Sequence, residues 1–172
     1  MGVFNLDQMK QSIIMPQLLE GNNALCITKI SESNTFAVGT MTGVYIINDY
    51  KTTRRMLEGK GVLSVKLIGD NLICGTMKHG YFLLDIKNNI EKKLTDSKQS
   101  VISICLLSLI DVNYSNLALT LEEGSVNIIN MATGSIVKIS DVPKTSFYTD
   151  SQMQIMNNTN DDYFSFVFIG KN

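Results

Sequence analysis

The chain has 172 residues, of which 44% are hydrophobic and 18% charged, and its 15 Lys and Arg nearly balance 16 Asp and Glu to leave a net charge of −1. This composition excludes a disordered tail, and the lack of clustered basic residues argues against a nucleic-acid partner. The longest uncharged apolar stretch, residues 101–110, is too short to span a bilayer, and the N-terminus lacks the features of a signal peptide. We therefore expect one soluble, cytoplasmic domain over residues 1–172, with no membrane partner.

The first predicted element is a short apolar run at residues 2–7. It matches residues 43–48 and 80–85, where Gly likewise opens an apolar run that ends in Asp or Asn. We therefore interpret residues 1–15 as half of a repeating unit, beginning at the third strand of that unit. Residues 6–20 also fit an amphipathic helix broken at its proline, but the repeat match favours a strand followed by a linker.

Three longer segments then repeat one pattern, which is an apolar run, a tight turn containing glycine, and a second apolar run that ends in Asp or Asn. They cover residues 36–48, 72–85 and 117–130. The turn glycines Gly43, Gly80 and Gly124 are 37 and 44 residues apart, a spacing that suits four short strands better than a pair of helices. Val, Ile, Tyr and Phe fill these runs, and such side chains favour strands.

Each paired run has a strand candidate on either side. The preceding strand is the most apolar of its unit, and the following strand is the most charged. This gradient predicts sheets that run from a buried inner strand to a solvated outer edge, where charge prevents pairing with other chains. We therefore predict three units of four antiparallel strands, at about 24–58, 61–95 and 100–140.

Another half unit is predicted at about 147–170, where two strand candidates lead to Gly170. These candidates correspond to a first and a second strand. If the C-terminus is joined on paper to the N-terminus, Gly170 falls four positions before Gly2, as Gly39 does before Gly43. The two halves are therefore complementary parts of one unit.

The repeated segments resemble the blades of WD-repeat β-propellers. The resemblance rests on the period, on the Gly turn between the second and third strands, and on the residue that ends the third strand. That residue is Asp7, Asn48, Asp85 or Asn130. The resemblance covers nearly the whole chain and implies an all-β fold with three complete blades and two terminal half-blades.

The sequence also departs from the usual WD-repeat pattern. It contains no Trp, and no Gly-His pair precedes the first strands. The Asp expected in the turn is replaced by Thr42, His79 and Glu123. The residues of the hydrogen-bonded tetrad that rigidifies many such blades are therefore not all present.

The number of blades leads to alternative predictions for ring closure. We expect an incomplete propeller, which is part of a larger ring or closes by pairing with another copy or another protein. In the alternative, the second strand of the C-terminal half pairs with the third strand of the N-terminal half and closes a four-bladed ring. Open blades would leave apolar faces and unpaired strand edges exposed.

The reactive residues do not form a catalytic pattern. His79 is the only histidine, and it stands in a predicted turn, where an exposed polar residue is expected in any case. The adjacent acidic pairs, Glu122–Glu123 and Asp161–Asp162, are interpreted as solvated turns, because acid–base catalysis needs two carboxyl groups that converge on one substrate. We therefore assign no catalytic residue.

The predicted inner strands also lack a metal-binding pattern. Metal-dependent propellers bind their ion with Glu, Asp and Asn oxygens in the central channel. The polar residues of these strands are mainly Thr28, Lys29, Ser64, Lys66 and Ser103, which do not make an anionic cage. No metal or other cofactor is expected.

The basic pair and the cysteines are given structural interpretations. Arg54 and Arg55 are adjacent but lack the flanking residues of a phosphoinositide-binding motif, so they are placed on a solvated outer strand. Cys26, Cys74 and Cys105 each lie in an apolar run, and three thiols cannot all pair within one chain. We expect them to be reduced and buried.

These observations favour a non-catalytic protein-interaction module or scaffold. The resemblance implies a binding face that carries the turns between the second and third strands and the loops between blades. Its candidate residues are Met41, Thr42, Met77, Lys78, His79, Glu122 and Glu123. The alternatives are a metal-dependent propeller hydrolase or lactonase, and a purely structural fragment that completes a larger propeller.

Overall fold

The computed structural model describes residues 2–5, 10–13, 16–31, 34–107, 115–141, 152–157 and 164–169. Within these ranges the chain forms strands β1 to β16 and one short 3-10 helix, η1 (Pro16–Leu19). No helix among the described residues is long and apolar enough to cross a membrane. The all-β prediction is therefore confirmed.

Twelve of the strands form three four-stranded antiparallel sheets, which we call blades 1 to 3. Blade 1 contains β3 (Ala24–Lys29), β4 (Thr35–Thr40), β5 (Gly43–Asn48) and β6 (Lys51–Met56). Blade 2 contains β7 (Val62–Ile68), β8 (Asn71–Thr76), β9 (Tyr81–Asp85) and β10 (Ile90–Lys93). Blade 3 contains β11 (Val101–Leu106), β12 (Leu117–Glu122), β13 (Ser125–Asn130) and β14 (Ile136–Asp141). Within each blade, strands that are neighbours in the sequence are neighbours in the sheet.

The remaining strands form two antiparallel pairs. The N-terminal pair is β1 (Gly2–Asn5) with β2 (Lys10–Ile13), and the C-terminal pair is β15 (Gln152–Asn157) with β16 (Phe164–Ile169). Each pair forms a separate two-stranded sheet. The predicted architecture of three complete blades and two terminal half-blades is confirmed.

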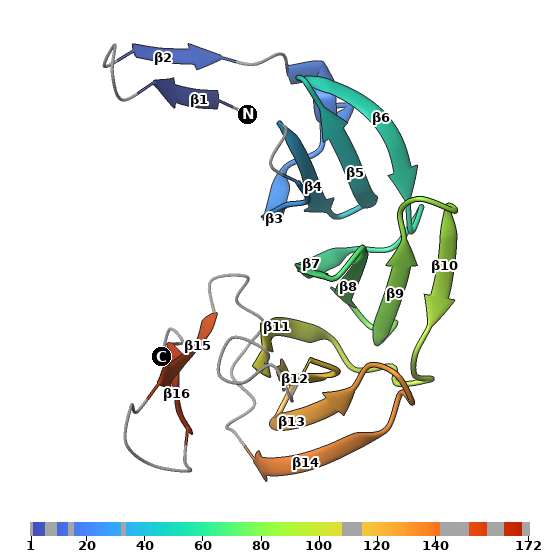
Figure 1. The fold of residues 1–172 in the computed structure, drawn as a ribbon, viewed down its shortest axis with the longest axis vertical. Coiled ribbons are helices and arrows are strands. Elements are labelled where there is room, and N and C mark those ends of the chain that lie inside the picture. The colour runs from blue at the N-terminus through green and yellow to red at the C-terminus, as the bar shows by residue number, and fades with distance from the viewer. Residues whose placement is uncertain are drawn as a thin grey trace.

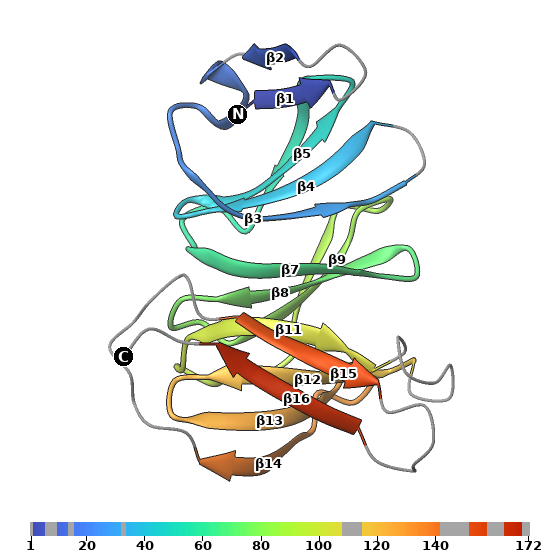
Figure 2. The same ribbon diagram turned by 90° about the vertical axis from the view of Figure 1, so that its left-hand side faces the viewer.

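The blades stand side by side along an arc, with their first strands inside and their fourth strands outside (Figure 1). Strand β7 contacts both β3 and β11, and β11 also contacts β15. The N-terminal pair and the C-terminal pair lie at opposite ends of the arc in both views (Figures 1 and 2). The structure is therefore an open arrangement of stacked blades.

Apolar side chains fill the spaces between successive blades. Between blades 1 and 2 the buried cluster includes Val44, Ile46, Leu72 and Leu84. Between blades 2 and 3 it includes Ile73, Tyr81, Ile104, Ala118 and Ile129. In both interfaces the contacting residues alternate along each strand, because successive side chains of a strand point to opposite faces.

Two backbone features recur from blade to blade. Each first strand has a β-bulge near its start, at Ala24/Cys26, Val62/Ser64 and Val101/Ser103. The second strands of blades 1 and 2 place glycine against the following blade. A Cβ atom on Gly39 would lie 2.9 Å from the Val62 carbonyl oxygen, and one on Gly75 would lie 2.9 Å from the Val101 carbonyl oxygen. Glycine thus permits the close approach of successive blades.

The segment before blade 1 does not form the amphipathic helix that was the alternative prediction for residues 6–20. Strand β2 and helix η1 form in place of an amphipathic helix. Leu18 and Leu19 pack in a buried cluster with Val38, Tyr45 and Ile47. Helix η1 therefore covers part of the face of blade 1 that points away from blade 2.

The three cysteines are thiols and do not form disulfides, as predicted. Cys74 is buried, whereas Cys26 and Cys105 are only half-buried. Burial raises the pKa of the Cys26 thiol to about 12 and raises that of Cys74 well above its ordinary value. The cysteines are thus packing residues with little thiolate character near neutral pH.

Candidate functional site

The hairpin turns and the loops between blades meet along one rim, which we call the turn face. The Gly59 amide donates to the Thr42 carbonyl at 3.0 Å, and the Met77 amide donates to the Gly61 carbonyl at 2.8 Å. In the next blade, the Glu123 amide donates to the Ser100 carbonyl at 3.2 Å. The first bond joins the hairpin turn of blade 1 to the loop that leads into blade 2. The other two bonds join the hairpin turns of blades 2 and 3 to the loops that precede those blades. The backbone therefore holds these loops in fixed positions.

Six of the seven candidate residues have side chains that reach the surface of the turn face. Met41 is an exposed apolar residue at 47%. Thr42 and Met77 are half-buried, whereas Lys78, His79 and Glu123 are exposed. Their role in partner binding stays a prediction.

Glu122 differs from the others, and its interpretation as a solvated turn residue is wrong. Its side chain is 3% exposed, at the end of β12. The Tyr81 hydroxyl, which belongs to blade 2, donates a hydrogen bond to Glu122 Oε1. The same hydroxyl lies 2.7 Å from Thr120 Oγ1. Glu122 is thus part of the interface between blades 2 and 3 and is not available as a surface contact.

The environment of Glu122 changes its protonation. Burial raises its pKa above the ordinary value of 4.5, while hydrogen bonds from Tyr81 and Asn127 partly offset this change. The pKa of the Tyr81 hydroxyl is raised as well, first by burial and then by the nearby carboxylate. Tyr81 therefore stays protonated and acts as a hydrogen-bond donor.

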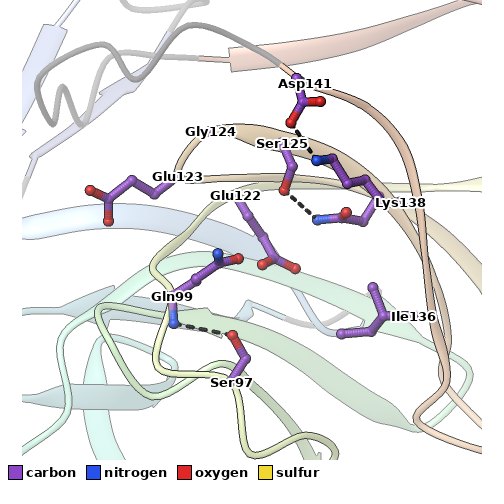
Figure 3. A pocket seen from close by; sticks show the side chains of 10 residues that line it. Ser97, Gln99, Glu122, Glu123, Gly124, Ser125, Ile136, Lys138 and Asp141 are labelled. Atoms are coloured by element: carbon purple, nitrogen blue, oxygen red, sulfur yellow. Dashed lines mark hydrogen bonds and ion pairs between the residues drawn. The ribbon is translucent and has the colours of Figure 1, made fainter.

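A polar pocket of about 570 Å³ opens next to this network (Figure 3). Glu122 lies between the loop that carries Ser97 and Gln99 and the strands of blade 3 in this view. Strand β14 supplies Lys138 and Asp141, which form an ion pair. The pocket thus lies at the edge of the turn face, between the loop that leads into blade 3 and the outer strands of blade 3.

A second polar network supports the turn face at blade 1. The Arg55 guanidinium lies over the Tyr45 ring, 5.3 Å from its centre, and it donates to Glu20 Oε2 at 3.1 Å. It also donates to the Thr42 carbonyl at 3.2 Å. Tyr45 donates to the same Glu20 oxygen at 3.1 Å. Arg55 therefore ties the outer strand β6 to the first hairpin turn.

The prediction that Arg54 and Arg55 lie on a solvated strand is therefore wrong in part. Both side chains are half-buried, although their strand is the outermost one of blade 1. The Arg54 guanidinium donates to the carbonyl oxygen of Ile86 in blade 2. The two arginines thus bridge structural elements, and their side chains are still partly exposed.

The acidic and polar residues considered for metal binding do not come together in the described part of the chain. No group of three or more His, Cys, Asp and Glu residues there is arranged to hold a metal ion. Of the inner-strand residues, Lys29 and Lys66 are exposed and Ser64 is buried. Asp161 and Asp162 lie outside the described residues.

Comparisons with known proteins support the fold. No protein-family model matches the chain, and no curated protein matches its sequence. Among solved structures, the computationally designed Ika4 protein matches with a TM-score of 0.56 and 14% identity, over 88% of this chain and 95% of that one. A WD40 domain of coronin from Toxoplasma gondii matches with a TM-score of 0.52 and 11% identity, over 70% of this chain.

A third match is an extracellular domain from B. thetaiotaomicron, described as part of a one-component system. Its TM-score is 0.65 and its identity 15%, over 92% of this chain. The chain spans 22% of that protein and 33% of the coronin domain. At such identities the likeness shows the fold alone, and the WD40 match supports the assignment of a β-propeller fold.

Proposed function

We propose that the chain is a non-catalytic, cytoplasmic protein-interaction module of the WD-repeat type, and that it binds its partner with the turn face. The observation that carries this proposal is the connection of successive turns and loops by backbone hydrogen bonds along one rim. Loops that a rigid scaffold holds in place are well suited to recognition, because little conformational entropy is lost on binding.

The side chains on this rim support the same proposal. Met41 offers an exposed apolar contact in the turn of blade 1, and Lys78, His79 and Glu123 add polar and charged groups in the turns of blades 2 and 3. Protein interfaces commonly combine apolar anchors with a polar rim of this kind. His79 is exposed in its turn, where it can contact a partner, and recognition is the chemistry proposed here.

A double charge reversal tests the proposal. Lys78→Glu combined with Glu123→Lys changes two exposed side chains of the turn face and leaves the net charge of the chain unchanged. The matched control exchanges the exposed ion pair Asp70–Lys87, whose Nζ and Oδ2 atoms are 2.6 Å apart, by Asp70→Lys and Lys87→Glu. Both residues lie in the turns at the end of blade 2 that is opposite the turn face.

The readout is the recovery of proteins cross-linked to each variant in cell extract, with the cross-linked peptides identified by mass spectrometry. We expect the wild type and the control to recover the same partners through peptides of the turn face. The turn-face variant should recover about tenfold less, which corresponds to about 1.4 kcal/mol of binding free energy. Equal recovery by both variants, at equal thermal stability, would contradict the proposal.

A further inference from the structure

The first strands of the three blades carry an apolar residue at one equivalent position, but its exposure differs. Ile27, Val65 and Ile104 pair in register with Val38, Cys74 and Thr120 of the second strands. Val65 is 2% exposed and Ile104 is 0% exposed, because a preceding blade covers each of them. Ile27 is 54% exposed. We call the face of blade 1 that points away from blade 2 its free face. The inner half of this face thus lacks the strands that cover the equivalent faces of blades 2 and 3.

The outer half of the same face is covered. Helix η1 packs Leu18 and Leu19 against Tyr45 and Ile47 of the third strand. Thr52 of β6 donates a hydrogen bond to the Leu18 carbonyl. The face of blade 1 is therefore closed outside and open inside.

The free face of blade 3 has the opposite pattern. Near its inner side, Leu119, Leu121 and Val126 are buried, and β15 contacts β11. On its outermost strand, Val137 is 64% exposed. Val137 pairs in register with Ile128, at the position where the outer strands of blades 1 and 2 carry Arg54 and Lys92. Blade 3 is thus closed inside and open outside, with an apolar residue where the other blades have a charge.

The two terminal pairs of strands match these two gaps. The C-terminal pair follows blade 3 and places β15 beside β11, so it supplies the first and second strands of a fourth blade. The N-terminal pair leads into the first strand of blade 1, as the third and fourth strands of blades 1 and 2 lead into the next blade, so it supplies a third and a fourth strand. Each pair is what the opposite end of the arc lacks.

We propose that a second copy of this chain closes the arc. Strand β16 of each copy pairs antiparallel with β1 of the other copy. Each such contact joins β15 and β16 of one copy to β1 and β2 of the other in a four-stranded shared blade, and a two-fold axis relates the two shared blades. The second copy is the occupant because the two terminal pairs are separate sheets at the two ends of the arc within one chain (Figure 1), so neither completes the other there. Two-fold symmetry covers both open faces of both copies at once, and it pairs the free edge of β1 with that of β16.

The repeat predicts the register of the shared blade. Phe4 aligns with Tyr45, and Ile169 aligns with Val38, and these two residues of blade 1 are register partners. Phe4 of one copy should therefore stand opposite Ile169 of the other. This inference is independent of the proposed binding role of the turn face.

Light scattering coupled to gel filtration is the first test. The full chain should elute with twice its mass of 19.1 kDa. Ile27→Asp and Val137→Asp each place a charge on one of the two open faces and should give monomers. Ile90→Asp is the matched control, since Ile90 is 55% exposed on the outer strand of blade 2, and it should leave the dimer intact. Circular dichroism confirms that each variant is folded.

Cysteine cross-linking tests whether the β16 that pairs with β1 comes from the other copy. When Phe4→Cys and Ile169→Cys are made in separate chains and mixed under oxidising conditions, a disulfide-linked dimer is expected. A folded wild-type monomer, or a cross-link that forms only within one chain carrying both substitutions, would overturn the proposal. Unchanged dimer mass in both Ile27→Asp and Val137→Asp would overturn it as well.

Discussion

The interface between blades 1 and 2 and the interface between blades 2 and 3 share a backbone design but differ in chemistry. In both, a glycine of the second strand allows the first residue of the next blade, Val62 or Val101, to approach closely. The buried cluster of the first interface consists of aliphatic, aromatic and thiol side chains. The second interface adds the buried hydrogen bond from Tyr81 to Glu122. Blade stacking is therefore set by the backbone, and the side chains between blades are free to vary in polarity.

The ends of the second strands show where this difference arises. The Thr40 hydroxyl donates to the Gly43 carbonyl at 3.0 Å, and the Thr76 hydroxyl donates to the Gly80 carbonyl at 2.7 Å, so each closes its own turn. Glu122 occupies the corresponding position in blade 3 and bonds to the preceding blade instead. One residue thus changes a local turn contact into a contact between blades.

Truncation in the apolar interface should have the largest effect. Leu84 is fully buried between blades 1 and 2, so Leu84→Ala leaves a cavity, and we expect it to lower the free energy of unfolding by about 2–5 kcal/mol. Urea denaturation measures this change. Ile129→Ala is the counterpart between blades 2 and 3, and a cost there above that of Leu84→Ala would contradict the view that the first interface depends more on its apolar core than the second does.

Addition of one methyl group tests the shared backbone design. A Cβ atom on Gly75 would lie 2.6 Å from Val101 Cγ1, so Gly75→Ala overpacks the interface and should cost about 1–3 kcal/mol. Gly39→Ala should have a similar cost, since its Cβ would approach the Val62 carbonyl oxygen. Thermal unfolding of both variants gives the comparison. Unchanged stability in either variant would mean that close approach is not required at that interface.

Removal of one hydroxyl tests the polar interface. Tyr81→Phe removes one of the two hydrogen-bond donors of the buried Glu122 side chain and should cost about 1–3 kcal/mol in urea denaturation. Tyr45→Phe is the matched control, because Tyr45 also donates to a glutamate, but Glu20 is exposed and keeps its bond from Arg55. We expect the control to cost less. Equal costs would show that burial of the acceptor does not decide the effect.

The smallest predicted effect is a change in pH dependence. Because burial raises the pKa of folded Glu122 above 4.5, the folded protein binds a proton at this site at higher pH than the unfolded chain does. The stability that this proton contributes is fully present below about pH 4.5 and is lost as the pH rises through the raised pKa. Glu122→Gln should remove this decline in the free energy of unfolding with rising pH. Urea denaturation of both proteins over this pH range measures the difference, and parallel curves would contradict it.

The sequence alone predicted the blades because their signals are local. The apolar runs and the turn glycine of each unit lie within a few residues of one another, and the same pattern recurs after 37 and 44 residues. The burial of Glu122 is not local, since its partner Tyr81 is 41 residues away in another blade. One signal could have indicated it, namely that Glu122 ends the apolar run before its turn glycine, where Thr40 and Thr76 end theirs. The contact of Arg54 with the backbone of blade 2 had no such signal.

The position of β7 between β3 and β11 has a consequence for local unfolding. In a stack of repeats, each unit is stabilised mainly by its nearest neighbours, so opening starts at the ends of the stack and proceeds inward. Backbone amides of β7 and β8 should therefore exchange with deuterium most slowly, and those of β3 should exchange faster. In a ring closed by a second copy the stack has no ends, and blade 1 should then be protected nearly as well as blade 2.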